Sequence, residues 1–380
     1  MPTPPATAGF ELPGAWTARS LTSFRKALLT WFDAHRRDLP WRSSRDPYRI
    51  WVSEVMLQQT TVAAVVPYFE RFLQAFPTIH ALAAADEQAV LKLWEGLGYY
   101  RRARHLHKAA KRLASDHPDE LPDDPTVWAA LPGVGRYILG AVLSQAFDRK
   151  LPIVEANTLR VLSRLFAYPG DPRTGSGLKW VWAAAERVLP EKRIGDFNQA
   201  MMELGALVCT PMAPDCANCP AARVCEAKRL GRQAAIPPPA KRPATVEVRE
   251  VAVVVRNGGK VLLVQRPADA LRGANLWEFP HGELMNDETH EVAALRIVQD
   301  LIGLKVKLGT ELLTVSHGVT RFAITMTCLE ATRTGGRFRS AFYTEGRWVE
   351  SGELGTFPLS TPQRKLATEI ARRGRQRRLC

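Results

Sequence analysis

Apolar residues recur at three- and four-residue steps from residue 21 to about residue 228, as in the set Phe24, Leu28, Leu29 and Phe32. This spacing places apolar side chains on one face of an α-helix. Proline and glycine separate the segments that carry the pattern. Residues 21–228 are therefore predicted to form an all-α domain.

The pattern changes after residues 229–245, which contain three consecutive prolines and several Lys and Arg residues. This composition favours an extended linker. Beyond it apolar residues alternate with a period of two, as in Val251, Val253 and Val255, and the Asn-Gly-Gly turn at 257–259 predicts a β-hairpin.

The remaining segments predict an α+β domain over residues 246–375. Its further elements are a helix near 288–302, a strand pair near 311–330 and a basic helix from about 361.

The chain has 380 residues, enough for two domains, and 46% of them are hydrophobic. It contains no run of eighteen apolar residues, and its N-terminus does not pair a basic segment with an apolar one. We therefore expect no membrane association, disordered tails at residues 1–20 and 376–380, and a cytoplasmic protein of the bacterial type.

The formal net charge is +14, from 52 Lys and Arg residues against 38 Asp and Glu residues. Neutralisation of phosphates supplies most non-specific affinity for nucleic acids. The charge therefore makes a nucleic acid the first partner to consider.

Cys209, Cys216, Cys219 and Cys225 form a C-x6-C-x2-C-x5-C string within 17 residues. Only two other cysteines are present, so the pattern does not indicate a disulfide framework. Four thiolates suit either a tetrahedral zinc ion or a [4Fe–4S] cluster, and the spacing alone does not choose between them.

Glu54 is a candidate general acid. Asp46 as N-cap and Pro47 as the first helical residue predict the start of its helix, in which it shares a face with Ile50 and Leu57. A carboxyl group among apolar side chains has a raised pKa and can stay protonated near neutral pH. The alternative is an ion-paired Glu at the edge of the core.

Glu155 lies at a predicted helix start, two residues before Asn157. Cleavage of an N-glycosidic bond needs an acid that protonates the leaving base and a carboxylate that stabilises the sugar cation. Glu54 and Glu155 together fit this chemistry. The alternative for Glu155 is a helix N-terminal charge that interacts with the helix dipole.

Gly133, Val134 and Gly135 lie between two helical patterns in the segment LPGVGRY. Glycine permits a tight turn whose N–H groups approach a phosphate closely. The segment therefore predicts a helix–hairpin–helix that contacts the DNA backbone, although ordinary turns also contain such glycine pairs.

The sequence contains the segments VSEVMLQQT, WEGLGYYRRARHLHKAA, LPGVGRY, IVEANTLRVLSR and FNQAMMELGALVCTP besides the cysteine string. Together these segments closely resemble the MutY-type adenine DNA glycosylases of the helix–hairpin–helix superfamily, over residues 21–375. The resemblance implies that adenine mispaired with 8-oxoguanine or guanine in double-stranded DNA is flipped out and removed. It also implies a [4Fe–4S] cluster instead of zinc, and a nucleoid-associated monomer on DNA.

The resemblance assigns roles to individual residues. Glu54 would protonate adenine N7, Glu155 would stabilise the oxocarbenium ion, and Asn157 would be a polar partner of the acid and its water network. The residues implied at the substrate are Trp41, Arg42 and Gln199 in the adenine pocket, Gln59 and Tyr99 in the base stack, and Gly133, Val134 and Gly135 at the phosphates.

Tyr137 stands where the glycosylase-lyases of this superfamily carry a lysine that forms a Schiff base with the sugar. Tyrosine cannot form one, so the resemblance implies a monofunctional enzyme that leaves an abasic site. This residue also argues against the alternative of an endonuclease III-like lyase that acts on oxidised pyrimidines.

Glu155 departs from the aspartate of the family. A displacement of about 1 Å in a catalytic group can lower the rate about 100-fold. A weakly catalytic or inactive lesion-binding paralogue is therefore the second alternative.

The C-terminal domain resembles a MutT-like domain that keeps the spacing of the Nudix box without its acids. The retained positions are Gly282, Glu288, Arg296, Gly303 and Leu304. Ile297, Asp300 and Leu301 stand where metal-binding glutamates are needed, so we expect lesion recognition instead of magnesium-assisted hydrolysis.

Ser316 and His317 match a Phe-Ser-His loop of the family and are expected to contact 8-oxoguanine. Val315 replaces the phenylalanine. Because a base–aromatic stack is worth roughly 1–3 kcal/mol, we expect softer lesion discrimination. An ordinary hairpin turn is the alternative for this segment.

Overall fold

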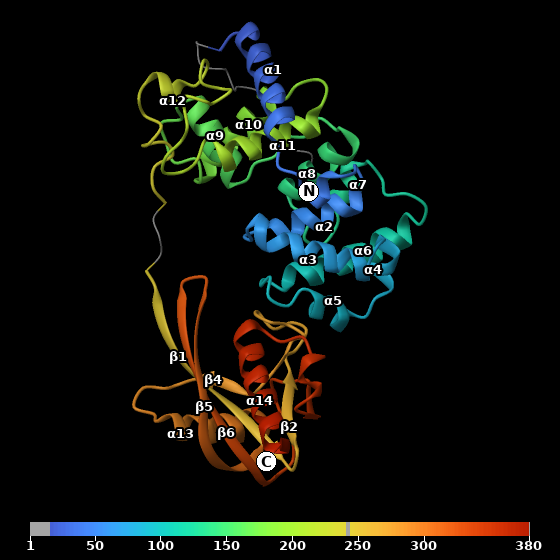
Figure 1. Ribbon diagram of the computed structural model, residues 1–380, viewed down its shortest axis with the longest axis vertical. Helices are drawn as coiled ribbons and strands as arrows, with labels where there is room; N and C mark the ends of the chain where they lie inside the picture. The colour runs from blue at the N-terminus through green and yellow to red at the C-terminus, as the bar shows by residue number, and fades with distance from the viewer. Residues whose placement is uncertain (1–15, 241–243, 380) are drawn as a thin grey trace. The chain divides into compact units, whose positions relative to one another are not determined.

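The computed structural model describes residues 16–240 and 244–379, and its contacts divide the chain into two compact units (Figure 1). Unit 1 comprises residues 16–83 and 108–240, and unit 2 comprises residues 84–107 and 244–379. Residues 84–107, expected in the all-α domain, thus belong to the second unit by their contacts. The domain boundaries inferred from the sequence remain predictions.

Helix α1 (Ala18–His35) confirms the apolar pattern at the start of unit 1. Phe24, Leu28 and Phe32 are buried on one face of it. The helix begins within the segment expected as a tail, because Thr17 and Ser20 form a capping box that satisfies free N–H groups. Residues 1–15 lie outside the described part of the chain.

Further helical elements follow α1 up to the first strand. They are η1 (Pro40–Arg42), α2 (Pro47–Leu57), α3 (Val62–Ala75), α4 (Ile79–Ala84), α5 (Glu87–Leu93), α6 (Arg101–Asp116), α7 (Pro125–Ala129), α8 (Arg136–Phe147), α9 (Ala156–Leu165), α10 (Gly175–Val188), α11 (Ile194–Leu207) and α12 (Glu226–Arg229). Of these, α5 and the start of α6 belong to unit 2.

Two packing arrangements position the candidate residues of unit 1. Helices α1, α9, α10 and α11 surround an apolar core that includes Phe24, Val161, Val181 and Phe197. Helix α2 packs against α8. It starts as predicted, because Asp46 Oδ1 accepts a hydrogen bond from the N–H of Tyr48 at 2.8 Å.

Unit 2 contains a mixed sheet with the strand order β3-β2-β1-β6-β5, to which β4 adds by pairing with β1 and β7 by pairing with β2. The strands are β1 (Val246–Asn257), β2 (Lys260–Gln265), β3 (Trp277–Glu278), β4 (His281–Glu283), β5 (Leu304–Val319), β6 (Phe322–Gly336) and β7 (Glu345–Glu350). Strands β1 and β6 are parallel, with Val246 opposite Phe322. The predicted hairpin is confirmed as β1 and β2, with its turn at Gly258 and Gly259.

Both faces of this sheet are covered, by α13 (His290–Ile302) and α14 (Thr361–Leu379) (Figure 1). Val251 faces the cluster that includes Ile297 of α13, while Ala252 faces the cluster that includes Leu366 of α14. Successive β1 residues point to opposite faces, so residues 251–255 are all buried. The short 3-10 helix η2 (Glu353–Gly355) precedes α14.

The structure corrects two expectations about flexible segments. Residues 229–240 are not a free tether, because Ile236 is buried and its carbonyl oxygen accepts a hydrogen bond from Arg164 Nε at 2.7 Å. The expected C-terminal tail is helical through Leu379, since Arg, Gln and Leu favour helices. Residues 241–243 and 380 are outside the described residues.

Across the described residues, no helix is long and apolar enough to cross a membrane.

Candidate active site

Helix α2 holds Glu54 in the interior of unit 1, with 3% of its surface exposed. Two side chains of α8 hydrogen-bond its carboxyl group: Tyr137 Oη donates to Oε2 at 2.5 Å, and Gln145 Nε2 donates to Oε1 at 2.8 Å. Burial raises the pKa of Glu54, and the two hydrogen bonds offset only part of that rise. The chemistry available to this group is proton donation near neutral pH.

Glu155 caps the start of α9. Its Oε2 accepts the N–H of Asn157 at 2.8 Å, and its Oε1 accepts the N–H of Thr158 at 2.9 Å. Burial raises the pKa of Glu155 above its ordinary value, and these backbone hydrogen bonds offset only part of the rise. The negative charge of Glu155 further raises the pKa of Glu54, so the two carboxyl groups interact electrostatically. The side chain of Glu155, which is longer than the aspartate of the family, thus folds back onto its own helix.

Arg42 and Gln199, both implied by the resemblance, hydrogen-bond each other directly, and Arg42 also pairs with Glu203, a residue that no motif in the sequence marks. Arg42 donates from Nε to Gln199 Oε1 at 2.8 Å and from Nη2 to Glu203 Oε2 at 3.1 Å. Burial alone would raise the pKa of Glu203, but hydrogen bonds from Arg37 and Arg42 lower it to about 2. Glu203 therefore fixes the arginine. Trp41 is 5% exposed and lies in the core.

Asn157 of α9 lies against Gly205 of α11. Its Oδ1 accepts a hydrogen bond from Arg160 Nη2 at 2.9 Å. A Cβ atom on Gly205 of α11 would lie 2.5 Å from the Cβ of Asn157. The backbone of α11 reaches this position only because residue 205 has no side chain.

The residues implied in DNA contacts are exposed or half-buried. Gln59 follows α2 with φ 58°, and Tyr99, in unit 2, is 50% exposed with φ 48°. Gly133 and Gly135 are exposed and Val134 is half-buried, with Gly135 at the N-cap of α8. An exposed turn before a helix N-terminus can present N–H groups to a phosphate.

The four cysteines are half-buried in the loop that follows α11. Burial, together with the neighbouring thiols, raises the pKa of Cys219 to about 12. Arg164 Nη1 contacts the loop through the carbonyl oxygen of Thr210 at 2.7 Å and Cys209 Sγ at 3.4 Å. Within the described ranges no set of three or more His, Cys, Asp or Glu side chains is arranged to hold a metal ion. The four thiols are nonetheless the donor set that a [4Fe–4S] cluster uses.

The segment expected as a lesion-contact loop is part of strand β5. Ser316 is exposed, His317 is half-buried and Val315 is 4% exposed in the core, because neighbouring strand residues face opposite sides. His317 Nδ1 has no hydrogen-bond partner within the part of the chain that the structure describes. Ser316, His317, Arg321 and Phe322 help to line a pocket at the end of the β5–β6 hairpin.

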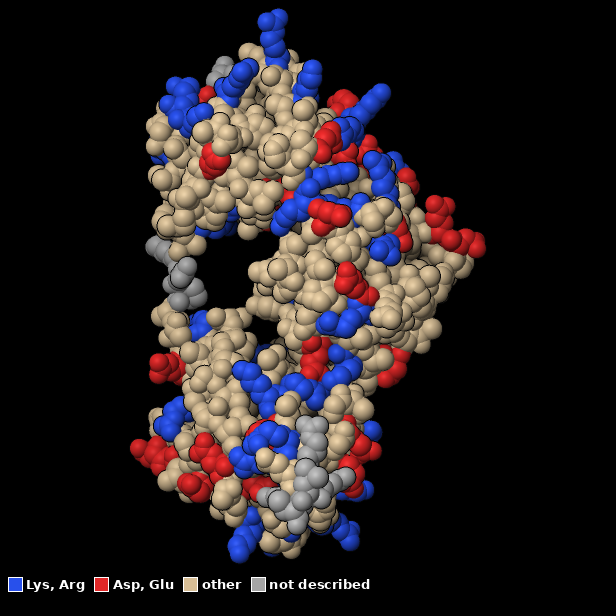
Figure 2. Space-filling model, viewed as in Figure 1, with Lys and Arg blue, Asp and Glu red and all other residues tan. Residues whose placement is uncertain are grey.

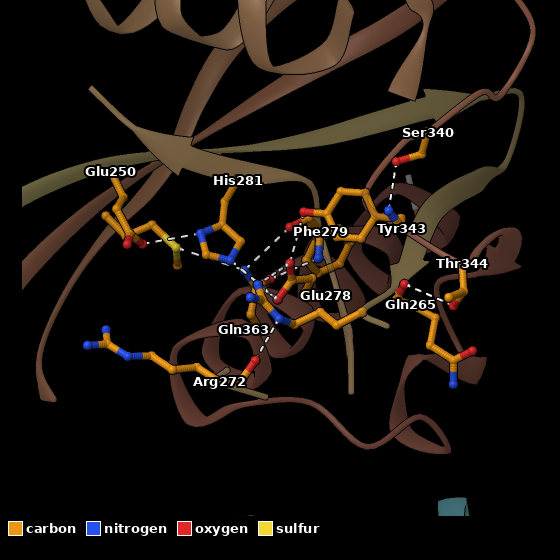
Figure 3. Close-up of polar contacts among 12 residues, drawn as sticks. Glu250, Gln265, Arg272, Glu278, Phe279, His281, Ser340, Tyr343, Thr344 and Gln363 are labelled. Atoms are coloured by element: carbon orange, nitrogen blue, oxygen red, sulfur yellow. Dashed lines mark hydrogen bonds and ion pairs between the residues drawn. The ribbon is translucent and has the colours of Figure 1, made fainter. Parts of the chain in front are cut away.

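A buried charged network lies in the same unit (Figure 3). Glu278 is 5% exposed and accepts hydrogen bonds from Arg266 Nη1 at 3.0 Å and Tyr343 Oη at 2.9 Å. The His281 ring lies between carboxylates, 3.3 Å from Glu278 Oε2 and 3.2 Å from Glu250 Oε2. Burial would lower the pKa of His281, but the two carboxylates raise it to about 10. No motif in the sequence predicts this network, because most of its members are far apart along the chain. Only the three-residue spacing of Glu278 and His281 is a local indication of it.

The Nudix-box positions on α13 serve the packing of unit 2. Arg296 pairs with Glu288 through two hydrogen bonds, of 2.7 and 2.8 Å. Ile297 is 1% exposed, and its side chain would lie 3.3 Å from a Cβ placed on Gly282. An acid at position 297 would be buried here.

Lys and Arg side chains are spread over the visible faces of both units, interspersed with Asp and Glu (Figure 2). The net charge alone therefore does not mark a DNA-binding surface on this face.

Comparisons with known proteins match both units. Residues 52–178 match the model of the HhH-GPD superfamily base excision DNA repair proteins, and residues 250–369 match that of the NUDIX domain. A thermostable thymine-DNA glycosylase of known structure is 29% identical, with a TM-score of 0.51, over 56% of this chain and 98% of that one.

Two mammalian relatives extend the similarity over both units. The adenine DNA glycosylase of Rattus norvegicus is 35% identical over 402 residues, covering 91% of this chain and 77% of the rat protein. That of Mus musculus is 38% identical over 327 residues, covering 72% of this chain and 63% of the mouse protein. The chain therefore belongs to the adenine DNA glycosylases, with a helix–hairpin–helix glycosylase fold followed by a Nudix-like fold.

Proposed function

We propose that the protein hydrolyses the N-glycosidic bond of adenine mispaired with 8-oxoguanine or guanine in double-stranded DNA. The observation that carries this proposal is a pair of carboxyl groups that interact electrostatically, in which buried Glu54 has a raised pKa and Glu155 is hydrogen-bonded by backbone N–H groups. The relatives named adenine DNA glycosylases support adenine as the base.

In the proposed reaction Glu54 transfers its proton to N7 of the flipped adenine, and the C1′–N9 bond breaks with its electron pair leaving on the base. The Glu155 carboxylate stabilises the positive charge that develops on the sugar. Water then adds to C1′ and its proton returns to Glu54, which gives free adenine and an abasic site. Asn157 positions polar groups beside this pair. Tyr137 cannot form a Schiff base, so the enzyme is monofunctional.

A single-turnover assay on a duplex with one 8-oxoguanine–adenine pair tests this proposal. We expect Glu54→Gln to lower the rate of adenine release by about 1,000-fold, because the general acid is lost. Glu70→Gln, on the exposed surface of α3, is the matched control and should leave the rate unchanged. Equal rates for native protein and Glu54→Gln would refute the assignment of the acid.

For the adenine pocket we propose Arg42, Gln199 and Trp41, with Glu203 fixing the arginine. For the DNA strands we propose Gln59 and Tyr99 in the base stack, and the turn at Gly133, Val134 and Gly135 at the phosphates. The exposure of Gln59, Tyr99, Gly133 and Gly135 supports their assignment to DNA contacts.

Recognition of 8-oxoguanine is proposed for Ser316 and His317. It is supported by the pocket that they line and by His317 Nδ1, which has no hydrogen-bond partner among residues 16–240 and 244–379. Phe322 in the same pocket offers an aromatic surface, which the buried Val315 does not. Ser316→Ala and His317→Gln should lower the ratio of rates on 8-oxoguanine–adenine and guanine–adenine duplexes. The exposed Thr314→Ala is the control, and an unchanged ratio in both test variants would contradict the assignment.

We also propose that Cys209, Cys216, Cys219 and Cys225 hold a [4Fe–4S] cluster, which would order the loop that carries them. The purified protein should be brown, with iron and sulfide present and absorbance near roughly 400 nm from thiolate charge transfer. A colourless protein with one equivalent of zinc would overturn this assignment.

A lesion-binding protein with little catalysis is the second candidate, favoured by the fold-back of Glu155 onto α9. It predicts tight binding to the 8-oxoguanine–adenine duplex and negligible adenine release. Rapid adenine release by Glu155→Asp but not by the native protein would support this candidate. Rapid adenine release by the native protein would exclude it.

A further inference from the structure

The side chain of Gln145 is the second hydrogen-bond donor to the carboxyl group of Glu54, the proposed acid. We infer that Gln145 is a positioning residue, which orients the carboxyl group of Glu54 and stabilises its carboxylate as the proton leaves. The inference rests on the proposed role of Glu54 as the acid.

The geometry of this contact is specific. Gln145 is 7% exposed and Glu54 3% exposed, and the donor and acceptor are 91 positions apart in the sequence. Tyr137 and Gln145 both belong to α8 and donate to different oxygens of the same carboxyl group. Two donors on one rigid helix fix both the position and the plane of the carboxyl group.

The hydrogen bond from Gln145 strengthens during the reaction. When Glu54 gives up its proton, both of its oxygens share a negative charge, and a hydrogen bond to a charged acceptor is roughly twice as strong as one between neutral groups. An interaction that is stronger in the transition state than in the ground state accelerates the reaction. The amide carries no charge at any relevant pH, so it achieves this without adding a titrating group.

The groups around Glu54 determine the sign of the pH effect. Burial is the largest influence and raises its pKa; Tyr137 and Gln145 lower it, Glu155 raises it, and Arg42 lowers it. Removal of the Gln145 donor therefore raises the pKa of Glu54. The acid would stay protonated to higher pH, and the alkaline limb of the rate profile would move upward.

The test is the pH profile of single-turnover adenine release on the 8-oxoguanine–adenine duplex. Gln145→Met keeps the length of the side chain and removes its donor, and Gln145→Leu is a second variant in case the first folds poorly. We expect a plateau rate lower by about 100-fold, as for loss of one donor to a developing anion, together with an alkaline limb at higher pH.

Ser144→Ala is the matched control. Ser144 is the buried neighbour of Gln145 and accepts a hydrogen bond from Asn198 Nδ2 at 2.9 Å. Loss of this hydrogen bond should lower the free energy of unfolding without moving the alkaline limb of the rate profile. An unmoved limb in a folded Gln145 variant, or an equal movement in Ser144→Ala, would overturn the inference. Activity in Glu54→Gln would instead refute the proposed acid, so the two failures are distinguishable.

Discussion

Glu54 in unit 1 and Glu278 in unit 2 are glutamates of similar burial, 3% and 5% exposed, with opposite shifts in pKa. Burial raises the pKa of both. Glu54 is hydrogen-bonded by the neutral groups of Tyr137 and Gln145, and the rise persists. Around Glu278, His281 and Arg266 reverse it, and the pKa falls below its ordinary value.

The difference shows that burial does not by itself decide what a carboxyl group does. Neutral donors hold a carboxyl group while leaving its proton in place, which suits an acid. Cationic partners ionise it and bind it into the fold, which suits a structural network. The same substitution at the two positions should therefore have opposite effects on stability.

Glu278→Gln should have the largest effect. It removes the carboxylate that pairs with Arg266 and one of the two carboxylates that pair with His281, and breaking a buried ion pair costs about 3–5 kcal/mol. Hydrogen exchange of peptides from β2 and β3 under rising urea measures the free energy of unfolding in this unit. Glu345→Gln, which breaks an exposed pair with Arg347, should cost only about 0–1 kcal/mol. Equal losses of unfolding free energy in Glu278→Gln and Glu345→Gln would contradict a stabilising role for the buried network.

His281 makes the stability of unit 2 sensitive to alkaline pH. Its folded pKa of about 10 lies above its ordinary value of 6.5, so its contribution is complete below pH 6.5 and is lost as the pH rises toward 10. The stability difference between the native protein and His281→Gln should shrink by an amount on the order of 3 kcal/mol between pH 7 and pH 10. Thermal unfolding of both proteins at each pH measures it. A constant difference would show that the imidazole is not charged.

Glu54→Gln should have a smaller effect of opposite sign. A carboxyl group with a raised folded pKa loses stability as the pH rises above its ordinary value of 4.5, so Glu54 destabilises the fold at pH 7. The variant should be more stable by about 1 kcal/mol at pH 7, and the gain should vanish near pH 4. Urea unfolding at both pH values checks this, and a less stable variant at pH 7 would break the comparison.

Local signals in the sequence predicted the elements well. Asp46 and Pro47 marked the start of α2, and the Asn-Gly-Gly turn marked the β1–β2 hairpin, because caps and turns depend on neighbouring residues. The burial of Glu54 also followed from its apolar neighbours.

Partners that are distant in the sequence were not predictable in the same way. Gln145 and Glu203 carry no local mark, since their roles arise only when α8 packs on α2 and when α11 meets Arg42. The resemblance placed Ser316 and His317 in a loop, whereas the pairing of β5 with β6 continues through them. Strand pairing is a long-range property that a short motif does not contain.

The close approach of α11 to α9 at Gly205 has a consequence for variants of this protein. Even alanine at position 205 would push against Asn157, two residues beyond the carboxylate at the start of α9, and would carry that displacement into the proposed catalytic pair. A glycine without a proposed role in the chemistry would then rank among the least replaceable residues. Damage there would resemble a catalytic defect although no reacting atom had been altered.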